Sequence, residues 1–556
     1  MRRALLGALA GVAFILCWRG ADVRPSALVD PANVRAVGAF ARGLLPPDLS
    51  PGFLRVVGEA TVRTLGISIA GTVLSCILGL ALGVLGTASL WRRGPLVDAD
   101  GAGIGSALSA GAKGLARFFR AVPDLVWALL FVVGFGLGPL PGTLALAVSY
   151  AGVLGRVYAD LFEAVPPGPV LAVHAAGASR LQVFAAAIWP QAAGSVTAYT
   201  LYSFECCVRS AAVLGFVGAG GIGAEINLSM RLFEYGQVTT LLAAFVLLVL
   251  CSDAASRALR GRFRRSAVHG SGMLRDAVEL RPLRRGQAIL WAAILVVAFW
   301  QAGSGALLAP GAIPHLARFA AQLFPPELSP SFLASIAIPL GQTVAISVIG
   351  TALGIVLGGA LALPATASLM FDREASLRPV RAALYGIARL TLALLRSIPE
   401  LVWVLLCILA VGLGPFAGVI ALGLHTAGVL GKLYAESLEE VPPDAVEELR
   451  GIGASGLQRV LWGAWPQAKE TLASYTLLRW EHNLRASTVV GLLGGGGLGL
   501  ALYNAVQLGF YDRASTLVIV VFLLVSVTDA LAHRLRKKPS AEAALDSALT
   551  LVAEAG

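Results

Sequence analysis

Gly177-Ala-Ser-Arg-Leu-Gln-Val-Phe-Ala-Ala-Ala-Ile-Trp-Pro-Gln-Ala192 is followed, 276 residues later, by Gly453-Ala-Ser-Gly-Leu-Gln-Arg-Val-Leu-Trp-Gly-Ala-Trp-Pro-Gln-Ala468. In both copies the proline lies thirteen residues after the glycine. We expect a short helix, a glycine turn, a second short helix and a restart at the proline, which together form a rigid knuckle. One copy alone would be equally typical of an ordinary amphipathic loop, but two copies with the same spacing favour a defined structural element.

Other segments repeat in the same order, so the chain contains two copies of one repeated unit. Val122-Pro-Asp-Leu-Val-Trp127 corresponds to Ile398-Pro-Glu-Leu-Val-Trp403, and Ala151-Gly-Val-Leu-Gly155 recurs unchanged at Ala427–Gly431. We expect two homologous halves related by a pseudo-two-fold axis along the membrane normal. The predicted organisation is a first half over 1–257, a basic linker over 258–287, a second half over 288–538 and a tail over 539–556.

The composition predicts a polytopic membrane protein. Of 556 residues, 57% are hydrophobic and 13% are charged, whereas soluble proteins carry about 25% charged residues. The chain has about twelve apolar segments that could cross a bilayer and no period-2 alternation, which favours α-helices over a β-barrel. These segments lie near 4–18, 62–85, 117–135, 142–162, 194–216, 238–256, 288–308, 339–363, 387–411, 417–437, 471–493 and 514–532.

Basic residues predict the orientation. The densest basic run lies between Arg257 and Arg285, and the tail carries Arg534 to Lys538. Short basic loops stay in the cytoplasm, so we expect a protein of the cell membrane with both termini on the cytoplasmic side. This bias and attraction to membrane lipids account for the net charge of +11 without nucleic acid. The first apolar segment could be a cleaved signal peptide, but the matching segment at 288–308 favours a retained helix.

Few charges lie inside the predicted spans, and one pair recurs in each half. Glu205 and Arg209 are four residues apart, as are Glu481 and Arg485. Such a pair is either a structural i, i+4 ion pair or part of a polar substrate pathway. Arginine suits bidentate contact with an oxyanion, so we keep both interpretations open. His425 stands where the first half has Ser149, and we expect it to be a hydrogen-bonded structural residue.

A glycine-rich segment follows each of these charged spans. Gly218-Ala-Gly-Gly-Ile-Gly223 matches Gly494-Gly-Gly-Gly-Leu-Gly499, and both satisfy the G-x-G-x-x-G pattern. A dinucleotide site needs a preceding strand, and a transmembrane helix precedes these segments, so we reject that interpretation. We expect either simple turns or a flexible constriction on the outer side, formed by Gly218, Gly220, Gly221, Gly223, Gly494, Gly496, Gly497 and Gly499.

The chain shows no sign of catalytic chemistry. It lacks a G-x-x-x-x-G-K-[ST] loop, a Ser-His-Asp or Cys-His set and a clustered set of metal ligands. We therefore expect neither an enzyme nor a bound cofactor or metal. Two matching halves around a central path favour a transporter.

The knuckle resembles the EAA coupling loop of ABC-importer permeases, through Gly-Ala-Ser followed by Trp-Pro-Gln in each copy. The Pro-Asp/Glu-Leu-Val-Trp and Ala-Gly-Val-Leu-Gly motifs resemble the phosphonate-transporter permeases of that family. The resemblance implies a type I (MetI-like) all-α fold, two cytoplasmic ABC ATPase subunits that bind ATP and Mg²⁺, a periplasmic or lipid-anchored binding protein, and import of a phosphonate, phosphite or phosphate. The coupling-loop residues carried over are Gly177, Ala178, Ser179, Arg180, Glu447, Gly453, Ala454 and Ser455.

One departure separates the two loops. The acidic residue of the family's motif falls at Glu447, whereas the first half has Leu171 at the equivalent position. We expect the second-half ATPase dock to contribute more. The alternative function is an ion-coupled secondary transporter with two repeated halves. That class needs coupling carboxylates deep in the path, and Glu205 and Glu481 already have arginine neighbours.

Overall fold

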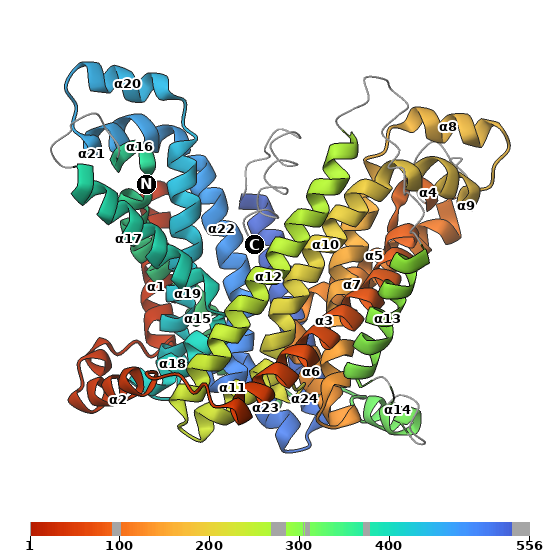
Figure 1. Cartoon of the computed structure of the whole chain (residues 1–556), viewed down its shortest axis with the longest axis horizontal. Coiled ribbons are helices and arrows are strands. Elements are labelled where there is room, and N and C mark those ends of the chain that lie inside the picture. The colour runs from red at the N-terminus through yellow and green to blue at the C-terminus, as the bar shows by residue number, and fades with distance from the viewer. Residues whose placement is uncertain are drawn as a thin grey trace. The chain divides into compact units, whose positions relative to one another are not determined.

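A computed structural model describes residues 2–91, 102–267, 285–303, 305, 312–370 and 378–535, and every regular element in these ranges is helical (Figure 1). The chain forms two compact units. The first-half unit contains Arg42–Gln322, and the second-half unit combines Met1–Ala41 with Leu323–Pro539. The predicted linker over 258–287 lies partly outside the described residues, and the predicted tail lies wholly outside them.

The first-half unit is built from long helices with short connecting helices between them. In chain order its helices are α3 (Pro51–Gly86), α4 (Ala88–Trp91), α5 (Ala102–Ala121), α6 (Asp124–Phe135), α7 (Pro139–Glu163), α8 (Pro167–Ala175), α9 (Arg180–Val183), the π-helical turn η2 (Phe184–Ile188), α10 (Trp189–Leu214), the 3₁₀ turn η3 (Gly215–Val217), α11 (Ile222–Arg231), α12 (Tyr235–Ala267), α13 (Arg285–Gln301) and α14 (Ala312–Gln322).

The second-half unit repeats this series. It begins with α1 (Arg2–Gly20), the 3₁₀ turn η1 (Pro25–Leu28) and α2 (Pro31–Gly43). It continues with α15 (Pro330–Ala365), α16 (Ala367–Met370), α17 (Arg378–Ser397), α18 (Glu400–Val411), α19 (Pro415–Glu439), α20 (Pro443–Gly451), α21 (Gly456–Arg459), the π-helical turn η6 (Val460–Ala464), α22 (Trp465–Val490), η7 (Gly491–Gly495), α23 (Gly497–Gln507) and α24 (Tyr511–Leu535).

The amino-terminal helix of each half packs in the unit formed by the other half. Helix α1 lies along α15, where Ala21 belongs to the buried cluster around Ala345 and Ile346 (Figure 1). Helix α13 packs in the same way on α3, where Gly66 faces Gln301 so closely that a Cβ would lie 2.5 Å from its side chain. Each compact unit therefore depends on chain segments from both sequence halves.

The helices lie where the sequence predicts spans, but among the described residues fewer than the predicted twelve are long and apolar enough to cross a membrane, and two of the predicted spans are broken. Seven helices are long and apolar enough to cross a membrane, and three bent pairs raise this to ten among the described residues. The shorter apolar segments Gly11–Gly20 and Ala292–Gln301 match the two remaining predicted spans.

The segments predicted as single spans at 117–135 and 387–411 are instead helix pairs. Helices α5 and α6 meet at 89°, and α17 and α18 meet at 97°. The break follows from Pro123 and Pro399, because proline lacks the N–H of the helical ladder and keeps the preceding residue out of helical conformation. In both pairs the proline caps the second helix and an acidic residue, Asp124 or Glu400, begins it.

Small residues bring the central helices of each unit close together. Gly79 and Gly83 of α3 face Leu154 and Tyr158 of α7, and a Cβ at either glycine would lie within 2.8 Å of the facing Cβ atom. Transmembrane helices commonly associate through such four-residue spacings of small side chains. Helices α15 and α19 repeat this packing at Gly354 and Gly358.

The repeated Pro-Pro-acid motif fixes the start of α3 to α12 and the start of α15 to α24. The Asp48 N–H donates to Gly236 O at 3.1 Å, and the Glu327 N–H donates to Asp512 O at 3.2 Å. In the second-half unit, Arg513 Nε also donates to Glu327 Oε2 at 2.6 Å. This hydrogen bond lowers the pKa of the Glu327 carboxyl.

Candidate substrate pathway and coupling loops

The Glu–Arg pairs singled out in the sequence form ion pairs within their own helices. On α10, Arg209 Nη2 lies 3.9 Å from Glu205 Oε1, and on α22, Arg485 Nη2 lies 3.1 Å from Glu481 Oε1. The glutamates are buried, with 2% and 10% of their side chains exposed, while the arginines are 32% and 27% exposed. Each arginine is therefore held by a buried carboxylate and keeps part of its side chain accessible.

Each glycine-rich segment forms a tight turn that a threonine of the neighbouring long helix supports. Thr64 Oγ1 of α3 accepts the N–H of Ile222 at 2.9 Å, and Thr343 Oγ1 of α15 accepts that of Leu498 at 2.8 Å. Gly221 and Gly497 have φ of +74° and +71°, a region that L side chains rarely adopt. A Cβ at Gly497 would also crowd Thr343.

The same turns are attached to the bent helix pairs. The Gly138 N–H donates to Gly218 O at 2.9 Å, and the Gly414 N–H donates to Gly494 O at 3.1 Å. Gly138 and Gly414 immediately precede α7 and α19, just after the end of α6 and α18. A movement of the bent pair would therefore reach the glycine turn directly.

The knuckles have the local structure that their spacing predicts. Helix α8 ends before Gly177, whose φ is +86°, and α9 starts after Ser179, whose N–H donates to Gln182 Oε1 at 2.8 Å. The second copy repeats this at Gly453, with a φ of +84°, and at Ser455 and Gln458. The prolines that follow Trp189 and Trp465 come just after π-helical turns. The wider hydrogen-bond spacing of such a turn tolerates proline, which has no N–H to donate.

The remaining predicted loop residues differ between the two copies. Ala178 packs partly buried in the cluster of α4, α8 and α9, and Arg180 lies over the Trp91 ring at 5.8 Å. Leu171 of α8 is 45% exposed, and Glu447, the residue at the equivalent place on α20, is also exposed. The two loops thus present an apolar and an acidic side chain at the same position.

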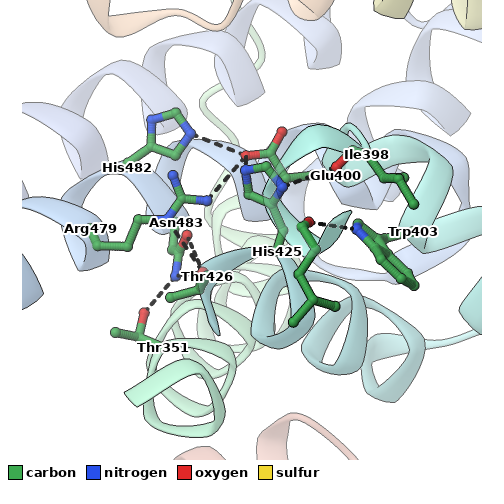
Figure 2. Close-up of polar contacts among 10 residues, drawn as sticks. Thr351, Ile398, Glu400, Trp403, His425, Thr426, Arg479, His482 and Asn483 are labelled. Carbon is green, nitrogen blue, oxygen red and sulfur yellow. Dashed lines mark hydrogen bonds and ion pairs between the residues drawn. The ribbon is translucent and has the colours of Figure 1, made fainter. Parts of the chain in front are cut away.

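A third polar group, absent from the sequence prediction, lies at the bend of the second half (Figure 2). Glu400 Oε1, at the start of α18, lies 3.3 Å from Arg479 Nη2 and 3.2 Å from His482 Nε2. His425 Nε2 of α19 lies 3.4 Å from the same oxygen, and its Nδ1 is 3.1 Å from Ile398 O. One carboxylate therefore joins three helices, and His425 has the structural role expected of it.

Hydrogen bonds continue from this cluster into the helix core. Arg479 Nε donates to Thr426 Oγ1 at 3.3 Å, and the side chain of Asn483, one turn further along α22, donates to Thr426 and to Thr351 (Figure 2). Asn483 and Thr426 are both fully buried. Burial of polar groups is tolerated where they bond to one another, so this network ties α15, α18, α19 and α22 together.

The cluster around Glu400 could have been predicted by comparing the sequences of the two halves. At the equivalent places the first half has Asp124, Ser149, Ser203 and Cys206. Three ionisable side chains thus appear together in the second half where the first has small polar ones. The carboxylate is shared, but its basic partners are not.

No group of three or more His, Cys, Asp or Glu residues in the described ranges is placed to hold a metal ion. The geometry is that of a duplicated helical membrane protein with one knuckle, one glycine turn and one bent helix pair in each copy.

Comparison with known proteins identifies the class. The family described as "Binding-protein-dependent transport system inner membrane component" matches residues 99–265 and 375–540. The chain belongs to this family of ABC-transporter permeases and carries its domain twice, so it is a non-catalytic, multi-pass transport component.

One relative matches nearly the whole chain, and two others match only part of it. The phosphate-import permease protein PhnE of Mycolicibacterium smegmatis is 31% identical over 518 residues, which cover 93% of this chain and 91% of that protein. The phosphite transport system permease protein PtxC of Stutzerimonas stutzeri is 34% identical over 253 residues, 45% of this chain and 88% of that protein. A putative cryptic phosphonate transport system permease protein of Escherichia coli, PhnE2, is 42% identical over 118 residues, 21% of this chain and 97% of that protein.

Proposed function

We propose that the chain is the membrane-spanning subunit of an ATP-driven importer for phosphate, phosphonate or phosphite. The observation that carries this proposal is the similarity to a phosphate-import permease along 93% of the chain. Relatives named for phosphite and phosphonate transport support the same chemical class. A tetrahedral phosphorus oxyanion is common to all three.

The arrangement of partners follows from the family. We propose that the loops containing α8 and α20 each dock one cytoplasmic ATPase subunit, which binds ATP and Mg²⁺, and that an extracytoplasmic binding protein delivers the substrate. Both termini then lie in the cytoplasm of a bacterial cell. The permease itself needs no cofactor in this scheme, and the segments over 1–257 and 288–538 are its two permease repeats in sequence.

Reconstitution tests the function directly. The chain is incorporated into proteoliposomes with its ATPase and binding protein, and uptake of labelled phosphate, phosphite and a phosphonate is measured with and without ATP. We expect ATP-dependent uptake of at least one of these anions, and a ligand screen on the binding protein identifies which. Uptake that follows an ion gradient without the ATPase would favour the secondary transporter instead.

Removing the pathway arginines should impair uptake more than folding. Arg209→Ala and Arg485→Ala each leave a buried glutamate in place and remove the partly exposed arginine side chain that we propose contacts the anion. We expect each variant to lower uptake at subsaturating substrate by about tenfold or more, since one charge-assisted hydrogen bond contributes about 1.5–3 kcal/mol and each 1.4 kcal/mol is tenfold. Initial uptake rates in proteoliposomes check this.

Two companion variants separate substrate contact from structure. Glu205→Gln and Glu481→Gln remove the buried carboxylates and should lower thermal stability when the pair is purely structural. Normal uptake by well-folded Arg209→Ala and Arg485→Ala proteins would contradict a role in the pathway.

The two ATPase docks should differ in strength. Glu447→Lys reverses the exposed acidic residue of α20, whereas Leu171→Glu introduces that residue on α8. We expect Glu447→Lys to lower substrate-stimulated ATP hydrolysis several times more than Leu171→Glu changes it, because the opposite charge repels its partner. ATPase assays on co-purified complexes measure both, and effects of equal size would refute the asymmetry.

A further inference from the structure

The carboxylate at the end of α7, and its counterpart at the end of α19, each bind two other elements at once. Glu163 Oε1 accepts the N–H of Ala88, the first residue of α4, at 2.7 Å. The same oxygen accepts a hydrogen bond from Lys113 Nζ of α5 at 3.1 Å. One side chain therefore caps α4 and forms an ion pair with α5.

The second half repeats this arrangement with a different cation. Glu439 Oε1 accepts the N–H of Ala367 at the start of α16 and a hydrogen bond from Arg389 Nη2 of α17 at 2.8 Å. Arg389 Nε also donates to Ala365 O at 2.8 Å. The three elements joined are equivalent in the two units although lysine has become arginine, so the connection itself is what the two copies share.

Each carboxylate lies between the knuckle and the bent helix pair. Glu163 is the last residue of α7, and α8 starts four residues later at Pro167. Helix α5, which Lys113 belongs to, runs to Ala121 and ends at the 89° bend. Glu163 thus connects the end of α7, four residues before α8 begins, to the helix that leads into the bend.

Apolar packing supports the same connection from the other side of α4. Leu90 of α4 is 1% exposed and packs in one cluster with Val170 of α8 and Val183 of α9. In the second half, Leu369 of α16 packs against the cluster that contains Leu438 of α19 and Val460 of the segment after α21. The short helix is held by the knuckle on its apolar side and by the carboxylate at its amino terminus.

The solvent exposure of the ion pair between Lys113 and Glu163 indicates that it positions the helices more than it stabilises the fold. The side chains of Lys113 and Glu163 are 39% and 34% exposed, and ion pairs at such sites contribute little to folding because water screens them. The effect of these contacts on geometry is larger, because Glu163 Oε1 alone holds the end of α7 against α4 and α5.

We propose that Glu163 and Glu439 are positioning residues that transmit movement of the coupling loops to the bent helix pairs α5–α6 and α17–α18. This inference rests on the proposed function, in which ATPase subunits dock on those loops. Binding and hydrolysis of ATP move α8 and α20, and the carboxylates convert that movement into rotation of α5 and α17.

The test is the ratio of substrate imported to ATP hydrolysed in proteoliposomes that contain the complete transporter. Glu163→Gln and Glu439→Gln keep the size of the side chain and an oxygen acceptor but remove the ion pair. We expect the double variant to lower the ratio about fivefold or more, the range of a typical coupling free energy. ATPase co-purification and thermal stability should stay near wild-type values.

The chain offers two matched controls. Asp160→Asn lies one turn earlier on α7, in an intrahelical ion pair with Arg156, and should leave the ratio unchanged. Lys113→Arg installs the cation found in the second half and should also preserve it.

The possible failures are distinguishable. A wild-type complex without ATP-dependent uptake would refute the proposed function. A wild-type complex that couples normally, beside a double variant with the same ratio, would overturn the positioning role alone. Parallel loss of stability and ATPase binding, with an unchanged ratio per assembled complex, would also overturn it.

Discussion

Replacing Arg479 by alanine is expected to lower the free energy of unfolding of the second-half unit by about 3 kcal/mol, because it leaves the partly buried Glu400 carboxylate without its arginine partner. Arg479 is 10% exposed, and its guanidinium lies 3.3 Å from the Glu400 carboxylate. Its loss leaves the carboxylate facing only His425 and His482, and it also removes the hydrogen bond to Thr426. Thermal unfolding of the purified protein in nanodiscs measures the change.

A double-mutant cycle separates the ion pair from the volume of the side chain. Glu400→Gln in the Arg479→Ala background should restore part of the stability, because the uncompensated charge is then gone. Ser203→Ala, at the equivalent place in the first half, should change stability by less than about 1 kcal/mol, since it removes only a small polar group. Equal stability of Arg479→Ala and Ser203→Ala would show that the cluster does not hold the bend.

Replacing Gly499 by alanine is expected to be the second most damaging change. A Cβ there would overlap the carbonyl oxygen of Thr488 and would lie 2.8 Å from the N of Leu492. These are backbone atoms of the end of α22 and the following turn, which cannot rotate away as a side chain can. We expect a loss of about 1–3 kcal/mol or more, as for an overpacked core, together with loss of transport.

Two further substitutions serve as controls for this glycine. Gly223→Ala places the same clash in the first half, against the carbonyl oxygen of Ala212, and should be similarly harmful. Gly341→Ala, on α15, meets no atom within 4 Å and should be neutral or slightly stabilising. Wild-type stability and uptake for Gly499→Ala would mean that the turn is loosely packed and not a constriction.

Local patterns were enough to predict much of this protein. Apolar segments gave the positions of the spans, and the fixed spacing of glycine, serine and proline gave the knuckles, because each depends on contacts within a few residues. The ion pairs at Glu205 and Glu481 were predictable for the same reason, since residues four apart on a helix are neighbours. The resemblance of the motifs then gave the family.

Features that depend on distant residues could only come from the tertiary structure. The cluster at Glu400 joins residues up to 82 positions apart, and the Glu163 connection spans 50 and 75 positions. Helices α1 and α13 each pack on the unit of the other half, although sequence order alone placed them with their own.

The sequence by itself thus determined the membrane class, the duplication, the family and the local turns, all of which follow from hydrophobicity and short-range periodicity. The tertiary structure decided which carboxylates join separate helices and which half each amino-terminal helix supports. The physical reason is that an ion pair or a packed glycine is specified by proximity in space, and proximity between distant segments exists only once the helices have packed.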